Sequence, residues 1–214
     1  MECPVYYNKV ARLKVDGGGH DRGLRSAMTS NIMTTPARSF ASAASSAALG
    51  AAVHPIPTGS WTVYFHEPED KSWTTESYKR LQTVSSWEAL GSLLRELGTH
   101  KTTNGLLRIM RGEYSPLWEN KANIRGGSYC LKVTRRNSVE VFNRYLAAAA
   151  LGCCAKDPAN EIVGVTISPK KGFCIIKIWN VNAKAFGAPT DLQLLHEEIK
   201  SEEILYRCHT DQRM

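Results

Sequence analysis

The chain has 214 residues, with 27 Lys and Arg against 20 Asp and Glu, a formal net charge of +7 and a pI near 9.1. Its length suits one domain with a tail or at most two small domains. The composition, 43% hydrophobic and 22% charged, excludes a wholly disordered chain, and the lack of any run of about 18 apolar residues excludes a membrane span. The basic excess favours an acidic or polyphosphate partner and is spread along the chain, so any basic patch has to be made by folding.

Residues 1–52 have the composition of a disordered tail. The glycines at 17–19 interrupt any early element, and residues 36–52 are mostly Ala and Ser with few large apolar side chains. The glycines do not form a phosphate loop, because no Gly-Lys-Ser/Thr follows them. An acid-poor, Ala- and Ser-rich stretch also occurs in mitochondrial transit peptides, but the arginines here are sparse and show no amphipathic stripe. We therefore predict a disordered tail over 1–52 and a folded domain over 53–214.

Within that domain, short strand-like runs alternate with longer helical patterns. Aromatic and β-branched residues that alternate along the chain predict strands, and apolar residues at helical spacing, such as Leu90, Leu94 and Leu97, predict helices. Because strands and helices do not alternate regularly, the order predicts an α+β fold with helices on one face of an antiparallel sheet. The expected elements are a strand over 61–65, a helix over 84–97, strands over 106–110 and 129–134, a helix over 139–149, strands over 162–167 and 173–179, a helix over 192–199, and a strand over 204–206.

The six cysteines show neither a metal-binding pattern nor a disulfide pattern. None belongs to a C-x-x-C pair, adjacent Cys153 and Cys154 cannot bridge to each other, and the histidines are scattered. The sequence also has no N-glycosylation acceptor and no signal-peptide core. We therefore expect reduced, mostly buried thiols, no metal, no cofactor and a cytoplasmic location. The cysteines are Cys3, Cys130, Cys153, Cys154, Cys174 and Cys208.

Two of the five tryptophans lie in polar, loop-like segments. Trp73 and Trp118 follow Asp-Lys-Ser and Ser-Pro-Leu, whereas Trp61 and Trp87 fit the periodic patterns of a core. A large ring in a loop needs a pocket beneath it or a planar ligand above it. Two such rings can sandwich a base with about 1–3 kcal/mol of stacking, and with more for a positively charged base. Glu119 can accept the N1–H and N2–H donors of guanine, which adenine lacks on that edge.

A bound nucleotide also needs cations for its phosphates. Each basic candidate is weak alone, because a pair of basic residues in a turn is usually a solvated loop. The candidates are Lys170 and Lys171 before a glycine, Lys177, Arg125 before two glycines, and the pair Arg135 and Arg136.

Several motifs occur in a fixed order: His54-Pro55-Ile56, Trp61, Lys71-Ser72-Trp73, Pro116-Leu117-Trp118-Glu119, Arg125-Gly126-Gly127 and Ile176-Lys177-Ile178-Trp179. This order resembles translation initiation factor 4E, the eukaryotic protein that binds the 7-methylguanosine cap of mRNA. The resemblance covers about 53–211, and the ordered set is far more specific than any single motif.

The resemblance implies both a fold and a site. The fold would be a curved antiparallel sheet of about eight strands, with three helices on its convex face and the cap on its concave side. Carried over by motif, Trp73 and Trp118 would sandwich the methylated guanine. Glu119 would bind the Watson–Crick edge of the base, and Trp179 would pack near its methyl group.

The resemblance also implies where the phosphates bind. Lys170 falls near the basic position of the family, with Lys171 and Lys177 as neighbours. The run that follows Lys171 is one residue longer than usual, so no single lysine is singled out. Ser128 replaces an arginine of the family, which removes one phosphate contact. Arg125 is expected to pair with acids of the pocket.

On its dorsal surface, the family binds a helical Tyr-x4-Leu-Φ peptide, with Φ hydrophobic, from initiation factor 4G or from 4E-binding proteins. His54, Pro55 and Val84 match this dock. The docking tryptophan is replaced by Glu88, with Trp87 one residue earlier, and one residue rotates a side chain by about 100° on a helix. We expect a monomer with an altered partner preference, unless a one-residue shift of the helix start restores the dock.

The leading hypothesis is a non-enzymatic protein that binds the cap and recruits mRNA to translation initiation. A second hypothesis keeps cap binding but makes the chain a divergent paralogue that represses or stores mRNA. A generic single-strand RNA binder would not distinguish methylated from unmethylated guanine. An enzyme with a Ser or Cys nucleophile is disfavoured, because there is no G-x-S-x-G elbow and no triad spacing.

Overall fold

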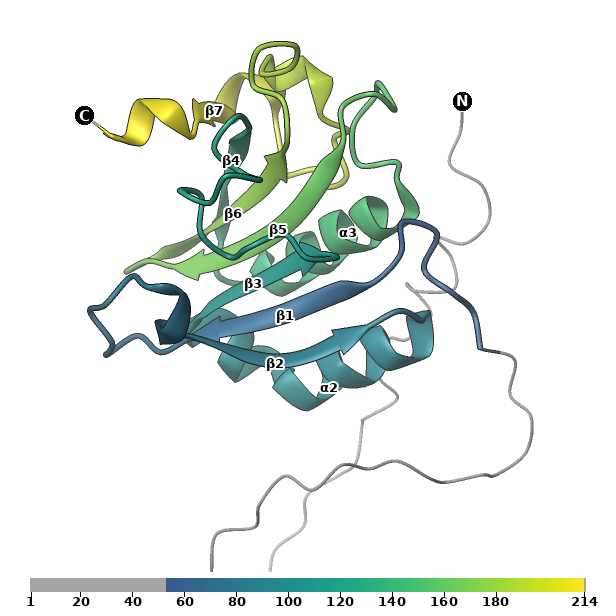
Figure 1. The fold of residues 1–214 in the computed structure, drawn as a ribbon, viewed down its shortest axis with the longest axis vertical. Coiled ribbons are helices and arrows are strands. Elements are labelled where there is room, and N and C mark those ends of the chain that lie inside the picture. The colour runs from purple at the N-terminus through teal and green to yellow at the C-terminus, as the bar shows by residue number, and fades with distance from the viewer. Residues whose placement is uncertain (1–52, 214) are drawn as a thin grey trace, which may run out of the picture. The chain divides into compact units, whose positions relative to one another are not determined.

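The structure, a computed structural model, describes residues 53–213, so the predicted tail over 1–52 lies outside the described residues. One curved, fully antiparallel sheet runs through them in the strand order β2-β1-β3-β5-β6-β4-β7 (Figure 1). The strands are β1 (Trp61–His66), β2 (Tyr78–Val84), β3 (Leu106–Arg111), β4 (Gly127–Thr134), β5 (Ile162–Pro169), β6 (Phe173–Asn180) and β7 (Leu205–Cys208).

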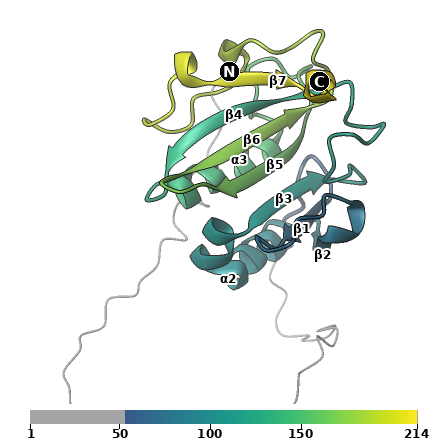
Figure 2. The ribbon, with the colours of Figure 1, turned by 90° about the vertical axis from the view of Figure 1, so that its left-hand side faces the viewer.

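Two α-helices, α2 (Trp87–Asn104) and α3 (Ser138–Leu151), cover one face of the sheet and leave the other face open (Figure 2). Ser86 caps the start of α2, where its side chain accepts a hydrogen bond from the Ala89 N–H at 3.2 Å. Helix α3 ends at Gly152, whose φ of 77° is the left-handed conformation that suits a C-cap. These local signals set where each helix begins and ends.

The main core fills the space between the sheet and the two helices. Side chains alternate along each strand, so on β3 Leu107 and Ile109 enter this core while Arg108 and Met110 lie on the open face. Each large side chain buried there contributes about 1.5–3 kcal/mol. The largest fully buried side chains of this core are Trp61, Tyr129, Tyr145 and Phe142.

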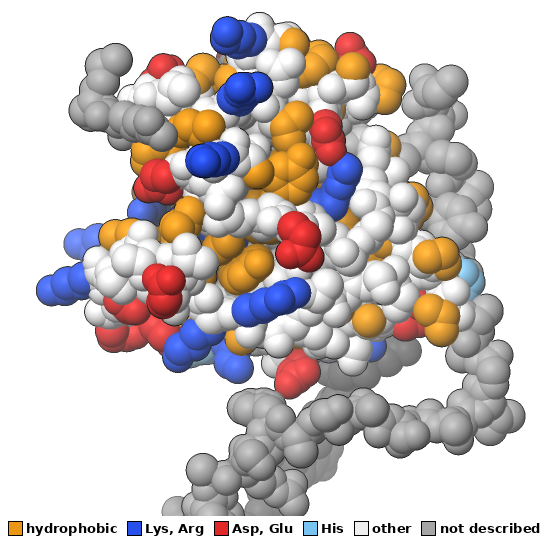
Figure 3. All heavy atoms as spheres, viewed as in Figure 1, with side chains coloured by type: hydrophobic (Ala, Val, Ile, Leu, Met, Phe, Trp, Pro, Cys, Tyr) orange, Lys and Arg blue, Asp and Glu red, His pale blue; other side chains and the backbone are white. Residues whose placement is uncertain are grey.

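A second, smaller apolar cluster lies on the open face. Met110, Val163 and Trp179 are buried in it, and four partly buried side chains pack against them: Tyr64, Tyr114, Trp118 and Val181. Figure 3 shows apolar side chains gathered in the middle of this face, with Lys and Arg side chains among them. The open face is therefore neither a plain solvated surface nor a second core.

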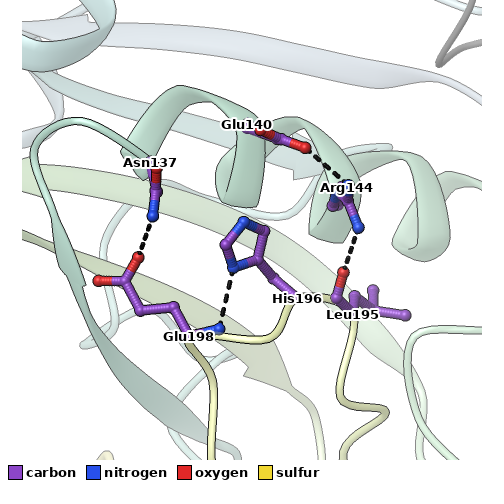
Figure 4. Close-up of polar contacts among 6 residues, drawn as sticks. All are labelled: Asn137, Glu140, Arg144, Leu195, His196 and Glu198. Atoms are coloured by element: carbon purple, nitrogen blue, oxygen red, sulfur yellow. Dashed lines mark hydrogen bonds and ion pairs between the residues drawn. The ribbon is translucent and has the colours of Figure 1, made fainter.

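The helix expected over 192–199 is wrong, and the described residues contain two α-helices rather than three. The segment is a loop with two carbonyl groups bonded to α3, and Figure 4 shows that of Leu195. The carbonyl oxygen of Gln193 accepts from the Tyr145 hydroxyl at 2.9 Å, and that of Leu195 accepts from Arg144 Nη1 at 2.9 Å. Backbone groups that a helix would pair internally are thus satisfied by tertiary contacts. The apolar spacing arises because Leu192 and Ile199 are buried in the core, not because the segment is helical.

Two further expectations need correction. The described residues form seven strands rather than about eight, and the chain passes from β7 into a 3-10 turn over Thr210–Arg213. Val84, expected at the start of a helix, is the last residue of β2. That strand is an edge strand whose five central residues are exposed, so it lacks the alternation that identifies the other strands. The α+β class and the curved antiparallel sheet are confirmed.

Candidate functional site

A row of side chains crosses the open face of the sheet at one level. The strand registers place Arg108 on β3 beside Thr166 on β5, Thr166 beside Lys177 on β6, and Lys177 beside Cys130 on β4. Tyr64 on β1 continues the row beyond Arg108. Directly opposite residues on neighbouring strands point to the same face, with Cβ atoms about 4.5–5.5 Å apart. Two cations therefore share this face, separated by one strand.

Arg108 is enclosed by aromatic rings. Its guanidinium carbon lies 4.7 Å from the centre of the Tyr78 ring and 5.2 Å from that of the Trp179 ring, within the range of cation–π attraction. One Nη donates to the carbonyl oxygen of Pro116. Burial lowers the pKa of Arg108, and nearby Tyr78 and Glu119 oppose that shift, so the guanidinium stays charged. No motif points to Arg108; its only signal is a lone cation between apolar residues of a strand.

Trp179 lies beside this cation and also contacts His209. The two rings meet edge to face, 4.8 Å apart, and Trp179 is only 2% exposed. His209 Nδ1 donates to the Asn123 carbonyl oxygen at 2.8 Å, and burial lowers the pKa of His209, so the ring is uncharged at neutral pH. Trp179 Nε1 and His209 Nε2 are buried without a hydrogen-bond partner among the described residues. Such atoms are uncommon and point to a bound water or ligand.

The loop that carries Trp118 and Glu119 is held against the same face. Asn123 Nδ2 donates to two carbonyl oxygens of this loop, at 2.8 and 2.7 Å. Trp118 packs against the cluster around Trp179, and Glu119 is exposed next to it. The structure thus brings together three of the residues that the sequence predicts for the base, namely Trp118, Glu119 and Trp179.

Trp73 makes no ring contact with Trp118 among the described residues. Its ring, 59% exposed, stacks on His66 with centroids 4.5 Å apart and planes within 5°. Tyr78 lies 6.5 Å from Trp73 and also contacts Arg108, so Trp73 borders the same aromatic array. His66 occupies one face of the Trp73 ring, and the exposure of the ring leaves room for a ligand beside it.

The predicted phosphate-binding lysines lie along the β5–β6 hairpin. Lys170 and Lys171 are exposed in its turn, and Lys177 lies in the row across the open face. Burial lowers the pKa of Lys177; Cys130 opposes this shift, and the positive charges of three neighbouring residues add to it. Those neighbours are Arg108, Arg207 and Lys170. Cations thus converge on this part of the face, which favours an anionic ligand.

The residues on either side of the double glycine, Arg125 and Ser128, differ from the expectation. Ser128, which replaces a family arginine, pairs in register with Arg207 on β7, so a guanidinium is still present at that level of the sheet. Arg125 is exposed and forms no ion pair among the described residues, so its expected pairing with acids of the pocket is not found.

At the start of α2, His54 and Glu88 form an ion pair. Nδ1 lies 2.7 Å from Oε1, and the His54 N–H donates to Oε2 at 3.2 Å. These contacts, led by the hydrogen bond from the His54 ring, lower the pKa of Glu88 to about 2. Val84 is 2% exposed and Trp87 packs against the main core. Of the predicted docking residues, Pro55 remains exposed beside the ion pair, whereas Val84 and Trp87 serve the core.

The flank of α3 that faces residues 195–198 is polar (Figure 4). Arg144 Nη2 lies 2.6 Å from Glu140 Oε1, and Asn137 Nδ2 donates to Glu198 at 2.8 Å. Ala148 is buried and offers no surface to a partner. The family resemblance implies an apolar docking wall near Arg144 and Ala148, and the exposed side chains on this flank are charged instead.

Within residues 53–213, no cluster of His, Cys, Asp or Glu has the arrangement of a metal site. In that same part of the chain, no helix is both long enough and apolar enough to cross a bilayer. Cys130, Cys154 and Cys174 are buried, as expected, and burial raises the pKa of Cys154.

Comparison with known proteins decides the family. Residues 58–213 match the family model described as Eukaryotic initiation factor 4E. The chain belongs to this family. The match spans nearly the whole described part of this 4E-family chain, so the resemblance inferred from the ordered motifs is confirmed.

Solved structures share the fold of this 4E-family chain at low identity. C. elegans eIF4E-3, solved with the 4E-binding protein Mextli and a cap analog, has a TM-score of 0.64 at 17% identity and covers 75% of this chain and 95% of that one. Ascaris suum eIF4E-3 with an m2,2,7G cap has a TM-score of 0.59 at 18% identity, and the match covers 74% of this chain and 92% of that one. Schistosome eIF4E with m7GpppA and a 4E-BP has a TM-score of 0.53 at 21% identity, and the match covers 62% of this chain and 74% of that one.

Proposed function

We propose that this 4E-family chain binds the 7-methylguanosine cap of mRNA on the open face of its sheet. The observation that carries the proposal is the packing of Trp118 on the Trp179 cluster, with Glu119 beside it and cations along the same face. An indole ring stacks on the base and attracts its positive charge, with cation–π energies of up to about 2 kcal/mol when water is excluded. Glu119 accepts the N1–H and N2–H donors, and the cations hold the phosphates.

Trp73 closes the sandwich with the ring face that does not stack on His66. The ring is 59% exposed, so a base can stack on it while the pair with His66 stays in place. Stacking on a base is worth about 1–3 kcal/mol. The C. elegans and Ascaris proteins, similar in fold, were solved with a cap analog and an m2,2,7G cap.

A second surface, at the start of α2, binds a helical partner peptide and so joins the bound mRNA to a 4G-like scaffold or a 4E-binding protein. Its exposed residues are His54, Pro55 and Glu88. The ion pair between His54 and Glu88 gives this surface a polar character, so we expect a partner with polar or basic side chains at this point. The similar C. elegans and schistosome proteins were solved with Mextli and a 4E-BP.

The test of cap binding is a titration with 7-methyl-GTP, followed by tryptophan fluorescence. We expect quenching in the parent protein and a loss of affinity of about 5- to 150-fold in Trp118→Ala, because one stacking ring is removed. Lys101→Ala, which removes an exposed cation of α2 on the covered side of the sheet, is the control. If 7-methyl-GTP causes no quenching, or if Trp118→Ala binds as tightly as the parent, cap binding on this face is wrong.

A second candidate, translational repression or storage of mRNA, is favoured by the altered surface at α2. The chain would still bind the cap without catalysis but would fail to recruit the scaffold. Pull-down of the initiation factor 4G scaffold, for the parent and for Glu88→Trp, separates the two functions. A parent that retains the scaffold supports recruitment, whereas retention seen only for Glu88→Trp supports repression.

A further inference from the structure

The candidate cap site already contains a positive charge of its own. The guanidinium of Arg108 lies between the rings of Tyr78 and Trp179, and no carboxylate among the described residues is within ion-pair distance of it. Its Nε is buried and has no hydrogen-bond partner within the described part of the chain. The aromatic rings are therefore the main stabilising partners of this cation.

Arg108 also contacts the parts that would hold the base. It donates to the Pro116 carbonyl, two residues before Trp118, and its charge interacts with Glu119. Trp179, expected near the methyl group, is one of its two ring neighbours. A base bound against these residues would thus lie close to the guanidinium.

This arrangement affects a charged base and an uncharged base differently. Methylation at N7 gives guanine a positive charge, and the usual benefit of that charge is its attraction to ring faces. Here the ring of Trp179 already attracts a cation, and the two positive charges repel each other in a partly desolvated site. Glu119 attracts the charged base, while Lys177, on the next strand but one, adds to the repulsion.

We propose that Arg108 is a specificity-determining residue that reduces the preference of this site for the cationic 7-methylguanine over uncharged guanine. The inference rests on the proposed binding of the cap by the open face. Its physical basis is that the protein supplies internally the cation that a methylated base would otherwise bring. The site then recognises the shape and the hydrogen-bonding edge of guanine more than its charge.

The first test measures the ratio of affinities for 7-methyl-GTP and GTP. In Arg108→Gln, which loses the charge but can still donate to Pro116, we expect the ratio to rise about tenfold, or ~1.4 kcal/mol. Repulsion between unit charges about 10 Å apart at an effective dielectric constant near 20 is of this size. Arg108→Lys keeps the charge and should keep the ratio. Lys171→Gln, at an exposed position in the turn between β5 and β6, should weaken both nucleotides similarly, because it acts on the phosphates.

The second test uses the parent protein alone and does not depend on how a variant folds. The probe is 7-methyl-7-deaza-GTP, which has the shape of 7-methyl-GTP but no positive charge on the base. We expect the two to bind within about threefold of each other, because the charge brings little net gain beside Arg108. In Arg108→Gln the charged nucleotide should bind the more tightly of the two.

The outcomes separate the inference from the function on which it rests. A higher ratio in Arg108→Gln, with near-equal binding of the two isosteres by the parent, supports the inference. An unchanged ratio in a folded Arg108→Gln that still binds, or a parent that prefers the charged isostere by more than about tenfold, overturns it. A parent that binds neither 7-methyl-GTP nor GTP overturns the proposed function instead.

Discussion

The two faces of the sheet are built from the same strands, but one carries the main core and the other carries the candidate site. On the face under α2 and α3, the inner strands β3, β4, β5 and β6 bury mostly apolar residues at alternate positions, and one continuous core results. On the open face, the same strands present cations, rings and buried donors without partners, arranged around a small apolar cluster. Strand β3 shows the contrast within three residues, Leu107, Arg108 and Ile109. Stability is thus concentrated on the covered face, which leaves the open face available for recognition.

The largest expected effect tests whether stability resides on the covered face. Phe142→Ala removes a fully buried ring of α3 and should lower the free energy of unfolding by about 3–5 kcal/mol, because it leaves a cavity. Urea denaturation measures the change. Phe173→Ala, at a partly buried position at the start of β6, is the matched control and should cost much less. Equal losses for the two variants would show that the faces do not differ in this way.

A buried network lies on the covered side of the sheet at the end of β6. Asn180 Oδ1 accepts from the Tyr206 hydroxyl at 2.7 Å and from the Gly127 N–H at 3.0 Å. Asn180→Ala leaves these donors unpaired, so we expect a loss of about 1–3 kcal/mol and faster hydrogen exchange in β7. Lys184→Ala, at an exposed position in the turn that follows β6, is the control. If exchange in β7 stays unchanged, the network does not hold this strand.

A smaller effect concerns the position of Trp73. His66→Leu removes the ring on which Trp73 stacks but keeps apolar bulk. Because this stack, together with the hydrogen bond from His66 Nε2 to the Ser72 carbonyl oxygen at 2.8 Å, orients Trp73, we expect affinity for 7-methyl-GTP to fall about threefold. His66→Phe keeps an aromatic plane and should lose less affinity. A rise in affinity for His66→Leu, in a folded protein, would mean that His66 competes with the base instead of orienting Trp73.

The smallest effect concerns the pH dependence of the ion pair at α2. The pKa of Glu88 is lowered from 4.5 to about 2, so its pairing with His54 stabilises the fold above the unfolded pKa and is lost as the pH falls from about 4.5 to 2. Both side chains are 47% exposed, so the contribution is small. The unfolding midpoints of the parent and of Glu88→Gln should converge over this range. Glu96→Gln, exposed on the same helix, should show no such convergence.

Local patterns predict the apolar strands well but fail where tertiary contacts decide. The alternation around Leu107 and Ile109 predicts β3, and helical spacing predicts α3. Edge strand β2 has no such alternation, because five of its residues are exposed. Residues 192–199 have helical spacing but bond their carbonyl groups to α3 instead. At the site, the motifs indicate Trp118, Glu119 and Trp179 but not the ring partner of Trp73.

The order of motifs along the chain is enough to assign the family, and alternation is enough to say which strand residues are apolar. Whether Arg108, Thr166 and Lys177 form one row depends on strand register, because residues far apart in the chain become neighbours only when backbone ladders pair. The same holds for the ion pair between His54 and Glu88, which joins a segment before β1 to the start of α2. The sequence determines which reactive side chains are present, whereas the distances between them depend on how the strands and helices pack.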